Sequence, residues 1–176
     1  MKKIEIYTDG SSLGNPGPGG WGSVFVENDT KSSKRGSSDA STEAFRKIIK
    51  ELGGFDKNTT NNRMELMAVI ETLKYLSARK VLAEKECNVT IFADSNYVLL
   101  GITTWIHNWE KNGWRNASKK EVMNQDLWKE LISLIRNYDN KINWQKVKGH
   151  SGHIYNDKAD EIATTFAEHK TFELIG

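Results

Sequence analysis

Four acidic residues lie where a predicted strand ends or a predicted helix begins, which is where side chains from different elements can meet. Asp9 and Asp94 each end a short run typical of a strand, whereas Glu65 and Asp160 lie in the first turns of two helical patterns. Clefts in α/β proteins open at the ends of strands, so carboxylates placed there are often used for chemistry. These four acids are therefore the first candidates for a catalytic site.

Each acid also has a structural explanation, and the residues alone leave both interpretations open. Asp9 begins an Asp-Gly pair, which is a frequent hairpin signal. Glu65 follows Asn62 at the spacing of a capping box, and Asp94 can cap the helix that comes after it. An acid such as Asp160 in a first helical turn is favoured by the helix dipole.

The elements that must position these acids follow from the hydrophobic pattern. Alternating or short apolar runs predict strands at Ile4–Asp9, Trp21–Glu27, Phe45–Leu52, Val89–Ala93 and Lys141–Lys148. The third run is ambiguous between strand and helix, and we expect it to end as a strand at Gly53–Gly54. Helical spacing predicts helices at Arg63–Lys80, from Tyr97, at Gln125–Tyr138 and at Asp157–His169.

The segments between these elements are rich in small and polar residues. Six of the 14 glycines and both prolines lie between Gly10 and Gly22, which predicts a tight loop after the first strand. Asn58–Asn62 is turn-like, and Gly149–Asn156 is predicted as a loop that carries histidines. Asp29–Ala44 holds five serines and few large apolar residues, so we expect a surface insertion in a single domain that spans 1–176.

Composition limits the class of protein. A length of 176 residues suits one domain with a sizeable core, and a net charge of +2 means that any basic surface must be local. Cys87 is the only cysteine, which excludes an intrachain disulfide and a thiolate metal cage. Because no apolar run approaches about 18 residues and no signal-peptide core is present, we expect a cytoplasmic protein without a membrane span.

Aromatic and basic residues alternate between Gly101 and Lys120. Four cations against one glutamate give this segment a local net charge of +3, and three of the six tryptophans lie here. Such a surface can stack on bases or sugars and pair with phosphates, or it can be a tryptophan-packed helix with solvated lysines. The residues concerned are Trp105, Trp109, Trp114, Lys111, Arg115, Lys119 and Lys120.

Six segments between Tyr7 and Ala163 together resemble the type 1 ribonuclease H family. In chain order they read YTDGSSLGNPGPGGWG, TTNNRMEL, ADSNYV, GITTWIHNWEKNGW, DLWKEL and VKGHSGHIYNDKADEIA. Each is weak alone, but six in the family's order are highly specific. The resemblance implies a ribonuclease H-like α/β fold, a five-stranded mixed sheet flanked by helices on both faces, which is compatible with the five predicted strands.

The resemblance further implies that Asp9, Glu65, Asp94 and Asp160 converge as a catalytic site that binds metal. Four carboxylates brought close would repel one another, and some would take up protons unless cations neutralised them. An all-oxygen cluster suits Mg²⁺, with Mn²⁺ as a substitute. Two such ions about 4 Å apart can activate water and stabilise the leaving oxygen in phosphodiester hydrolysis. The family's loop histidine corresponds to His150, which would manage protons or assist product release without binding metal.

By the same resemblance the substrate is an RNA/DNA hybrid duplex. Asn15 and the pair Asn61–Asn62 would contact 2′-hydroxyls, the groups that distinguish RNA from DNA. Thr60 with Asn61 would form part of a pocket for a phosphate of the DNA strand. Residues of the aromatic and basic segment would contact the backbone of the hybrid, namely Trp105, Lys111, Trp114 and Arg115.

Some positions depart from the pattern of well-known bacterial members. Asn96 stands where Gln is usual, so its contact with a sugar or base is open, and Asn58 replaces a phosphate-binding Arg. Glu110 dilutes the positive charge of the aromatic segment. His153 has no assigned function, since His150-x-x-His153 lacks a third ligand nearby for zinc. The sequence does not fix the Asn15–Pro16 peptide as cis or trans.

We therefore expect a monomeric, metal-dependent endonuclease that hydrolyses the RNA strand of hybrids and leaves 5′-phosphate and 3′-hydroxyl ends. No obligate protein partner is expected. One alternative is a module that binds hybrids without cutting them, and the presence of all four acids argues against it. Another alternative is a nuclease or integrase that acts on DNA. Asn15 and Asn61–Asn62 argue against it, because their positions favour recognition of RNA.

Overall fold

The computed structural model describes residues 2–29, 45–80, 87–138, 142–148, 153–169 and 173–176. The described elements, in chain order, are β1 (Lys2–Ser12), β2 (Gly17–Asp29), β3 (Phe45–Thr59), α1 (Asn61–Ala78), β4 (Cys87–Ala93), α2 (Asn96–Leu100), α3 (Ile106–Lys111), α4 (Gln125–Arg136), β5 (Ile142–Lys146) and α5 (Ile154–Ala167). A π-helical turn, Gly101–Trp105, joins α2 to α3.

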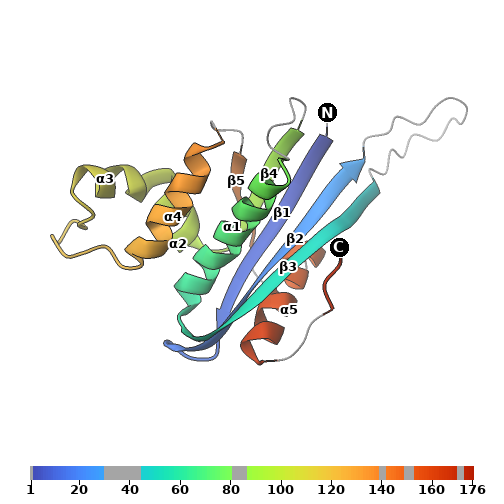
Figure 1. Ribbon diagram of the computed structural model, residues 1–176, viewed down its shortest axis with the longest axis horizontal. Helices are drawn as coiled ribbons and strands as arrows, with labels where there is room; N and C mark the ends of the chain where they lie inside the picture. The colour runs from blue at the N-terminus through green and yellow to red at the C-terminus, as the bar shows by residue number, and fades with distance from the viewer. Residues whose placement is uncertain (1, 30–44, 81–86, 139–141, 149–152, 170–172) are drawn as a thin grey trace, which may run out of the picture.

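The strands form one five-stranded sheet in the order β3-β2-β1-β4-β5. β2 runs antiparallel to both β1 and β3, whereas β4 is parallel to β1 and β5 is parallel to β4. Helix α1 packs on one face together with α4, and α5 covers the other face (Figure 1). The expected mixed sheet with helices on both faces is therefore confirmed.

Strand β1 lies at the centre of the sheet and is buried on both faces. Ile6 packs in the core that includes Leu66 and Ile70 of α1, while Tyr7 packs with Ile162 of α5. All five side chains are at most 1% exposed. Because neighbouring residues of β1 are held in two different cores, the part of this strand that carries Asp9 is fixed in position. The strand does not end at Asp9 as predicted but continues to Ser12.

Helix α5 lies directly on the backbone of β2. A Cβ added to Gly20 would lie 2.2 Å from the carbonyl oxygen of Ala163, and one added to Gly22 would lie 2.5 Å from that of Ala159. Side chains at these two positions would push α5 away from the sheet. The glycines thus set how closely the helix that carries Asp160 approaches.

Strand β3 is longer than predicted. The predicted end at Gly53–Gly54 and the predicted turn from Asn58 are wrong, because β3 continues to Thr59. The strand continues because each glycine pairs with a residue of β2, Gly53 with Gly22 and Gly54 with Trp21. The local sequence pattern does not reveal this pairing.

Helix α1 begins two residues before its predicted start at Arg63. Thr60 is its N-cap, and the Thr60 hydroxyl accepts a hydrogen bond from the backbone N–H of Arg63 at 3.3 Å. The predicted capping box between Asn62 and Glu65 is therefore wrong. Both residues lie inside the helix, so a capping function no longer explains Glu65.

The structural explanations offered for two other acids also change. Ser95, not Asp94, caps α2, because its hydroxyl accepts from the backbone N–H of Val98 at 3.3 Å. Helix α5 begins at Ile154, so Asp160 lies in its second turn and not in the first. The effect of a helix dipole falls off within the first turn, so it gives little reason for an acid at this position.

Some predictions fall on residues outside those described, namely most of the insertion at Asp29–Ala44 and the first part of the predicted loop Gly149–Asn156, with His150. The last part of that loop prediction is wrong, because α5 begins at Ile154 and not at Asp157. Asp29 itself is the last residue of β2. The Asn15–Pro16 peptide, which the sequence left open, is cis. None of the helices in the described ranges combines the length and the apolar composition needed to cross a membrane.

Candidate functional site

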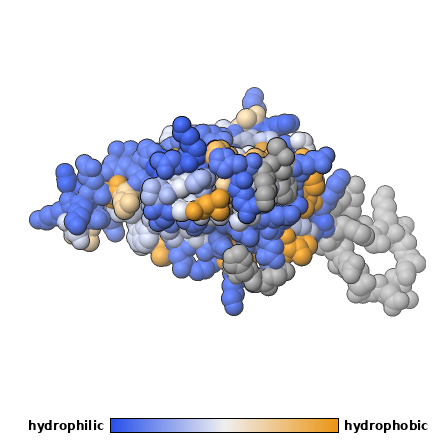
Figure 2. All heavy atoms as spheres, turned by 90° about the horizontal axis from the view of Figure 1, so that it is seen from below, coloured by the Kyte–Doolittle hydropathy of each residue, from blue (hydrophilic) through white to orange (hydrophobic). Residues whose placement is uncertain are grey.

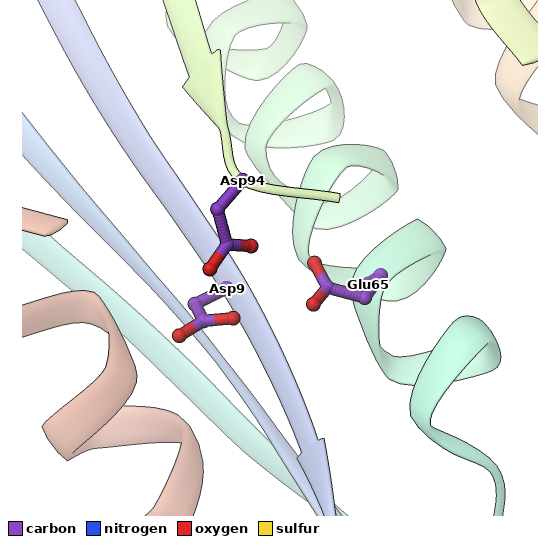
Figure 3. A group of neighbouring side chains, drawn as sticks. All are labelled: Asp9, Glu65 and Asp94. Atoms are coloured by element: carbon purple, nitrogen blue, oxygen red, sulfur yellow. The ribbon is translucent and has the colours of Figure 1, made fainter. Parts of the chain in front are cut away.

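Asp9, Glu65 and Asp94 come together from three separate elements (Figure 3). Asp9 is part of β1, Glu65 projects from α1, and Asp94 directly follows β4. One carboxylate oxygen from each lies within 4.8 Å of the other two. Asp9 and Glu65 are each 5% exposed, and Asp94 is half-buried, so the cluster is largely shielded from water but open on one side.

The register of the sheet explains why Asp9 and Asp94 are neighbours. Thr8 of β1 pairs with Ala93 of the parallel strand β4, and the two acids are the next residues along these strands. Adjacent strands lie about 4.8 Å apart, so acids at matching positions come close. Glu65 reaches the same place from α1, which packs on the sheet at β1.

Asp160 lies close enough to influence this cluster without belonging to it. Among the described residues, the group whose ligand atoms lie within 4.8 Å of one another does not include Asp160. It is half-buried on α5, and its charge contributes to raising the pKa of Asp9. His153, just before α5, packs instead against Tyr7 with ring centroids 4.8 Å apart.

Burial dominates the electrostatics of the cluster. It raises the pKa of Asp9 to about 8, with further contributions from the charges of Asp94 and Asp160. The backbone N–H of Gly10, which donates to Asp9 Oδ1 at 2.8 Å, opposes this shift. Burial, followed by the charges of Asp9 and Asp94, also raises the pKa of Glu65. Without a cation the cluster therefore retains protons near neutral pH.

The donor set fits a divalent metal ion. Glu65 Oε2 is buried and has no hydrogen-bond partner in the part of the chain that the structure describes. A buried acceptor left unpaired is costly, and a cation at this position would satisfy it. Oxygen ligands from carboxylates suit hard ions such as Mg²⁺ or Mn²⁺ better than soft metals.

The predicted substrate residues near the start of α1 are accessible. Asn15 is exposed in the turn between β1 and β2, and Asn61 and Asn62 are exposed in the first turn of α1. Thr60 is half-buried. Figure 2 views the molecule from the side on which β1 ends and α1 begins, and this surface is mainly hydrophilic.

The predicted tryptophans form a cluster attached to the core. The Trp109 ring lies 5.7 Å from that of Trp105, 6.2 Å from that of Trp114 and 5.4 Å from that of Trp128, which is fully buried. Lys111 and Arg115 are exposed beside this cluster. The segment therefore packs as a tryptophan-anchored unit while its cations face solvent.

A cavity of about 440 Å³ opens beside this cluster. Three asparagines that line it were not predicted from the sequence, because only Asn108 lies on α3, which ends at Lys111, so helical spacing does not group them. The lining consists of Trp105, Asn108, Trp109, Asn112, Arg115, Asn116 and Ala117. The tryptophan rings and the asparagine amides line this cavity together with Arg115, whose guanidinium donates to the carbonyl oxygen of Lys119 at 2.9 Å.

The chain resembles known proteins over nearly its full length. The RNase H family model matches residues 1–168. Ribonuclease H of Klebsiella pneumoniae subsp. pneumoniae is 42% identical over 176 residues, covering 100% of this chain and 96% of that protein. Ribonuclease H of Erythrobacter litoralis is 45% identical over 168 residues, covering 96% of this chain and 98% of that protein.

Solved structures agree with these relatives. The crystal structure of LC9-RNase H1, described as a type 1 RNase H with the type 2 active-site motif, matches with a TM-score of 0.71 and 29% identity. The match covers 99% of this chain and 77% of that chain. The solution structure of the PFV RNase H domain shares the fold, with a TM-score of 0.69 and 22% identity over 97% of this chain and 98% of that one. The chain belongs to the ribonuclease H family.

Proposed function

We propose that this chain hydrolyses the RNA strand of RNA/DNA hybrids at internal phosphodiester bonds. Water attacks the phosphorus and the P–O3′ bond breaks, which leaves 5′-phosphate and 3′-hydroxyl ends. Family membership supports the activity. The observation that carries the choice of site is the approach of Asp9, Glu65 and Asp94 to within 4.8 Å in a largely buried place.

Two Mg²⁺ ions are the proposed cofactor, with Mn²⁺ as a substitute. When bound, they would activate the attacking water and stabilise the leaving oxygen. The residues proposed to hold them are Asp9, Glu65, Asp94 and Asp160. The unpaired Glu65 Oε2 and the raised pKa of Asp9 support this assignment, because a cation would offset both the unmet acceptor and the repulsion between the acids.

The protein's own residues hold this site in shape before metal or substrate arrives. The N–H of Gly10 engages one oxygen of Asp9, and Glu65 is held on α1 by the packing of that helix against β1. Such fixed carboxylates need little rearrangement on binding. His150 is the proposed group that exchanges a proton or assists product release, beside the metal ligands and not among them.

Recognition of the hybrid is proposed to use residues around the cluster. Asn15, Asn61 and Asn62 offer amides to 2′-hydroxyls of the RNA strand. The Thr60 hydroxyl accepts from Arg63, which leaves its own hydrogen to donate to a phosphate of the DNA strand. Other proposed contacts come from Asn96, Trp105, Lys111, Trp114 and Arg115.

The remaining features of the proposal concern the chain as a whole. We expect a cytoplasmic monomer that needs no protein partner. Residues 1–176 would form one catalytic domain, in which 29–44 is a serine-rich surface insertion. These expectations follow from composition, and size-exclusion chromatography with light scattering should give the mass of one chain.

The proposal is tested by digesting matched RNA/DNA, RNA/RNA and DNA/DNA duplexes with Mg²⁺, each labelled on one strand. Only the RNA of the hybrid should be cut, at internal positions. Cutting of duplex DNA, or equal cutting of double-stranded RNA, would contradict the proposed discrimination by 2′-hydroxyls. Binding of the hybrid without any cleavage would favour the non-catalytic alternative.

Matched variants on α5 test the acids. Asp160→Asn should remove most of the activity if Asp160 holds metal. The control is Glu161→Gln, because Glu161 is the next residue, is exposed and pairs with Lys158 at 3.0 Å. Equal activity of the two variants would remove Asp160 from the proposed site.

A further inference from the structure

Lys146 and Asn96 form a pair beside the acidic cluster. The Lys146 ammonium donates a hydrogen bond to Asn96 Oδ1. Lys146 is the last residue of β5, where it pairs in register with Ala93, and Asn96 is the first residue of α2. The two side chains are exposed. Asp94 directly follows β4, which lies between β5, the strand of Lys146, and β1.

The partner of Lys146 leaves its charge available. Several cations of this protein are neutralised by carboxylates, such as Arg63 by Asp126 at 2.7 Å and Arg136 by Glu110 at 2.7 Å. Lys146 is bound instead by a neutral amide oxygen, and over the described ranges no carboxylate pairs with it. An amide orients the ammonium but does not cancel its charge, so a positive charge is held in place toward solvent.

The register places this charge on the same side of the sheet as Glu65. Thr8, Ala93 and Lys146 form one row across the three parallel strands. Lys146 lies two residues after Trp144 on β5, so its side chain is on the same face as that of Trp144, which packs against the α1 core. Neighbouring strands lie about 4.8 Å apart, so a flexible lysine one strand beyond Ala93 can reach a group bound next to the acids.

We propose that Lys146, oriented by Asn96, contacts a backbone phosphate of the nucleic acid next to the acidic cluster. This inference rests on the proposed function and names a further substrate-binding residue for it. A phosphate fits because it is the anion that a nucleic acid presents at regular intervals along its backbone. Since Asn96 Oδ1 is engaged by Lys146, the amide hydrogens of Asn96 are what remain to donate to a sugar or base acceptor.

The test measures binding of a labelled RNA/DNA hybrid to Asp9→Asn protein, so that the substrate stays intact. The dissociation constant is followed from about 50 to about 200 mM KCl. Lys146→Gln should weaken binding about 2- to 5-fold and reduce the slope of log affinity against log salt by about one unit. Lys146→Arg, which keeps the charge, should retain the slope.

The control is Lys47→Gln, which removes the same charge from β3, at the opposite edge of the sheet. It should change neither the affinity nor the slope. If Lys146→Gln and Lys47→Gln gave the same slope as the parent protein, the phosphate contact would be overturned.

A double-mutant cycle tests the orienting function of Asn96. In an Asn96→Ala background, Lys146→Gln should cost less affinity than it does alone, because the lysine is then no longer held. Additive effects would show that Asn96 does not orient Lys146. Cleavage by the unmodified chain is scored separately: failure to cut the hybrid refutes the proposed function, whereas cutting with an unchanged Lys146→Gln slope refutes only this inference.

Discussion

Gly10 and Glu65 meet backbone to backbone, because a Cβ added to Gly10 would lie only 2.2 Å from the backbone nitrogen of Glu65. Gly10 follows Asp9 directly, so this contact sets the separation between the strand that carries one acid and the helix that carries the other. Even a methyl group at position 10 would force α1 away from β1.

Gly10→Ala should therefore damage the cluster as well as the fold. We expect the free energy of unfolding to fall by about 1–3 kcal/mol, as for overpacked sites, and Mg²⁺ affinity to fall with it. Urea unfolding and calorimetric Mg²⁺ titration measure the two effects. Gly113→Ala is the contrast: it adds backbone strain at φ +61 where no atom lies within 4 Å, so only stability should change. An unaltered Mg²⁺ affinity in Gly10→Ala would show that this contact does not position the acids.

Stability without metal should depend on pH through Asp9. Its pKa is about 8 in the folded protein and near 4 in an unfolded chain, so the folded state binds the extra proton between these values. The stabilisation from this group is complete below about pH 4 and is lost as the pH rises through about 8. Unfolding in urea with EDTA should therefore require less urea at pH 8.5 than at pH 6.

Asp9→Asn supplies the control for this pH dependence. The amide does not titrate, so the variant should show a shallower pH profile and greater stability than the parent at high pH without metal. Turnover should be abolished while hybrid binding stays within a few-fold. A variant with the same pH profile as the parent would mean that Asp9 is ionised in both states.

Neutralising Lys111 and Arg115 together should weaken hybrid binding and flatten its salt dependence by up to about two units of slope. Both side chains are exposed beside the tryptophan cluster, so the fold should be unaffected. Fluorescence anisotropy at several salt concentrations measures the slope. The pair Lys3 and Lys47, exposed on β1 and β3, is the matched control. If the two double variants had equal slopes, the tryptophans would only pack in the core, and Lys111 and Arg115 would be solvated cations that do not contact the hybrid.

His150→Ala should lower kcat by roughly 10- to 100-fold, with a smaller change in KM. General acid–base help contributes less where bound metal ions activate the water. Single-turnover and steady-state rates separate the two proposed functions. A defect confined to steady state assigns His150 to product release, and a defect in both assigns it to proton transfer. Loss of Mg²⁺ binding as complete as in an acid variant would place His150 among the ligands.

Features set by local pattern were predictable from the sequence, whereas those set by distant partners were not. The strand that carries Asp9 is visible in its alternation, and so is the apolar run before Asp94. The predicted end of that strand at Asp9 is wrong, because pairing with β2 continues β1 to Ser12. The continuation of β3 through Gly53–Gly54 depends on pairing with β2, which no window around the glycines contains. Thr60 and Asn62 are both acceptable caps by residue type, and the choice of Thr60 follows from where β3 ends.

The tryptophan segment shows the same limit. Its composition suggested both core packing and nucleic-acid binding, and periodicity could not decide between them. The structure attaches Trp109 to Trp128, which lies on a different helix, and leaves Lys111 and Arg115 in solvent. One segment therefore has an anchored side and a charged side, and only the contact with α4 reveals which residues belong to each.

The acidic cluster draws its members from positions 9, 65 and 94, and none of these segments can build it alone. It exists only after β4 has paired with β1 and α1 has docked on the sheet, both of which are long-range events along the chain. Affinity for a divalent cation therefore reports whether these long-range contacts have formed. During refolding it should appear no earlier than the parallel strand pair, and a fragment that stops before β4 should lack it even where its helix has formed.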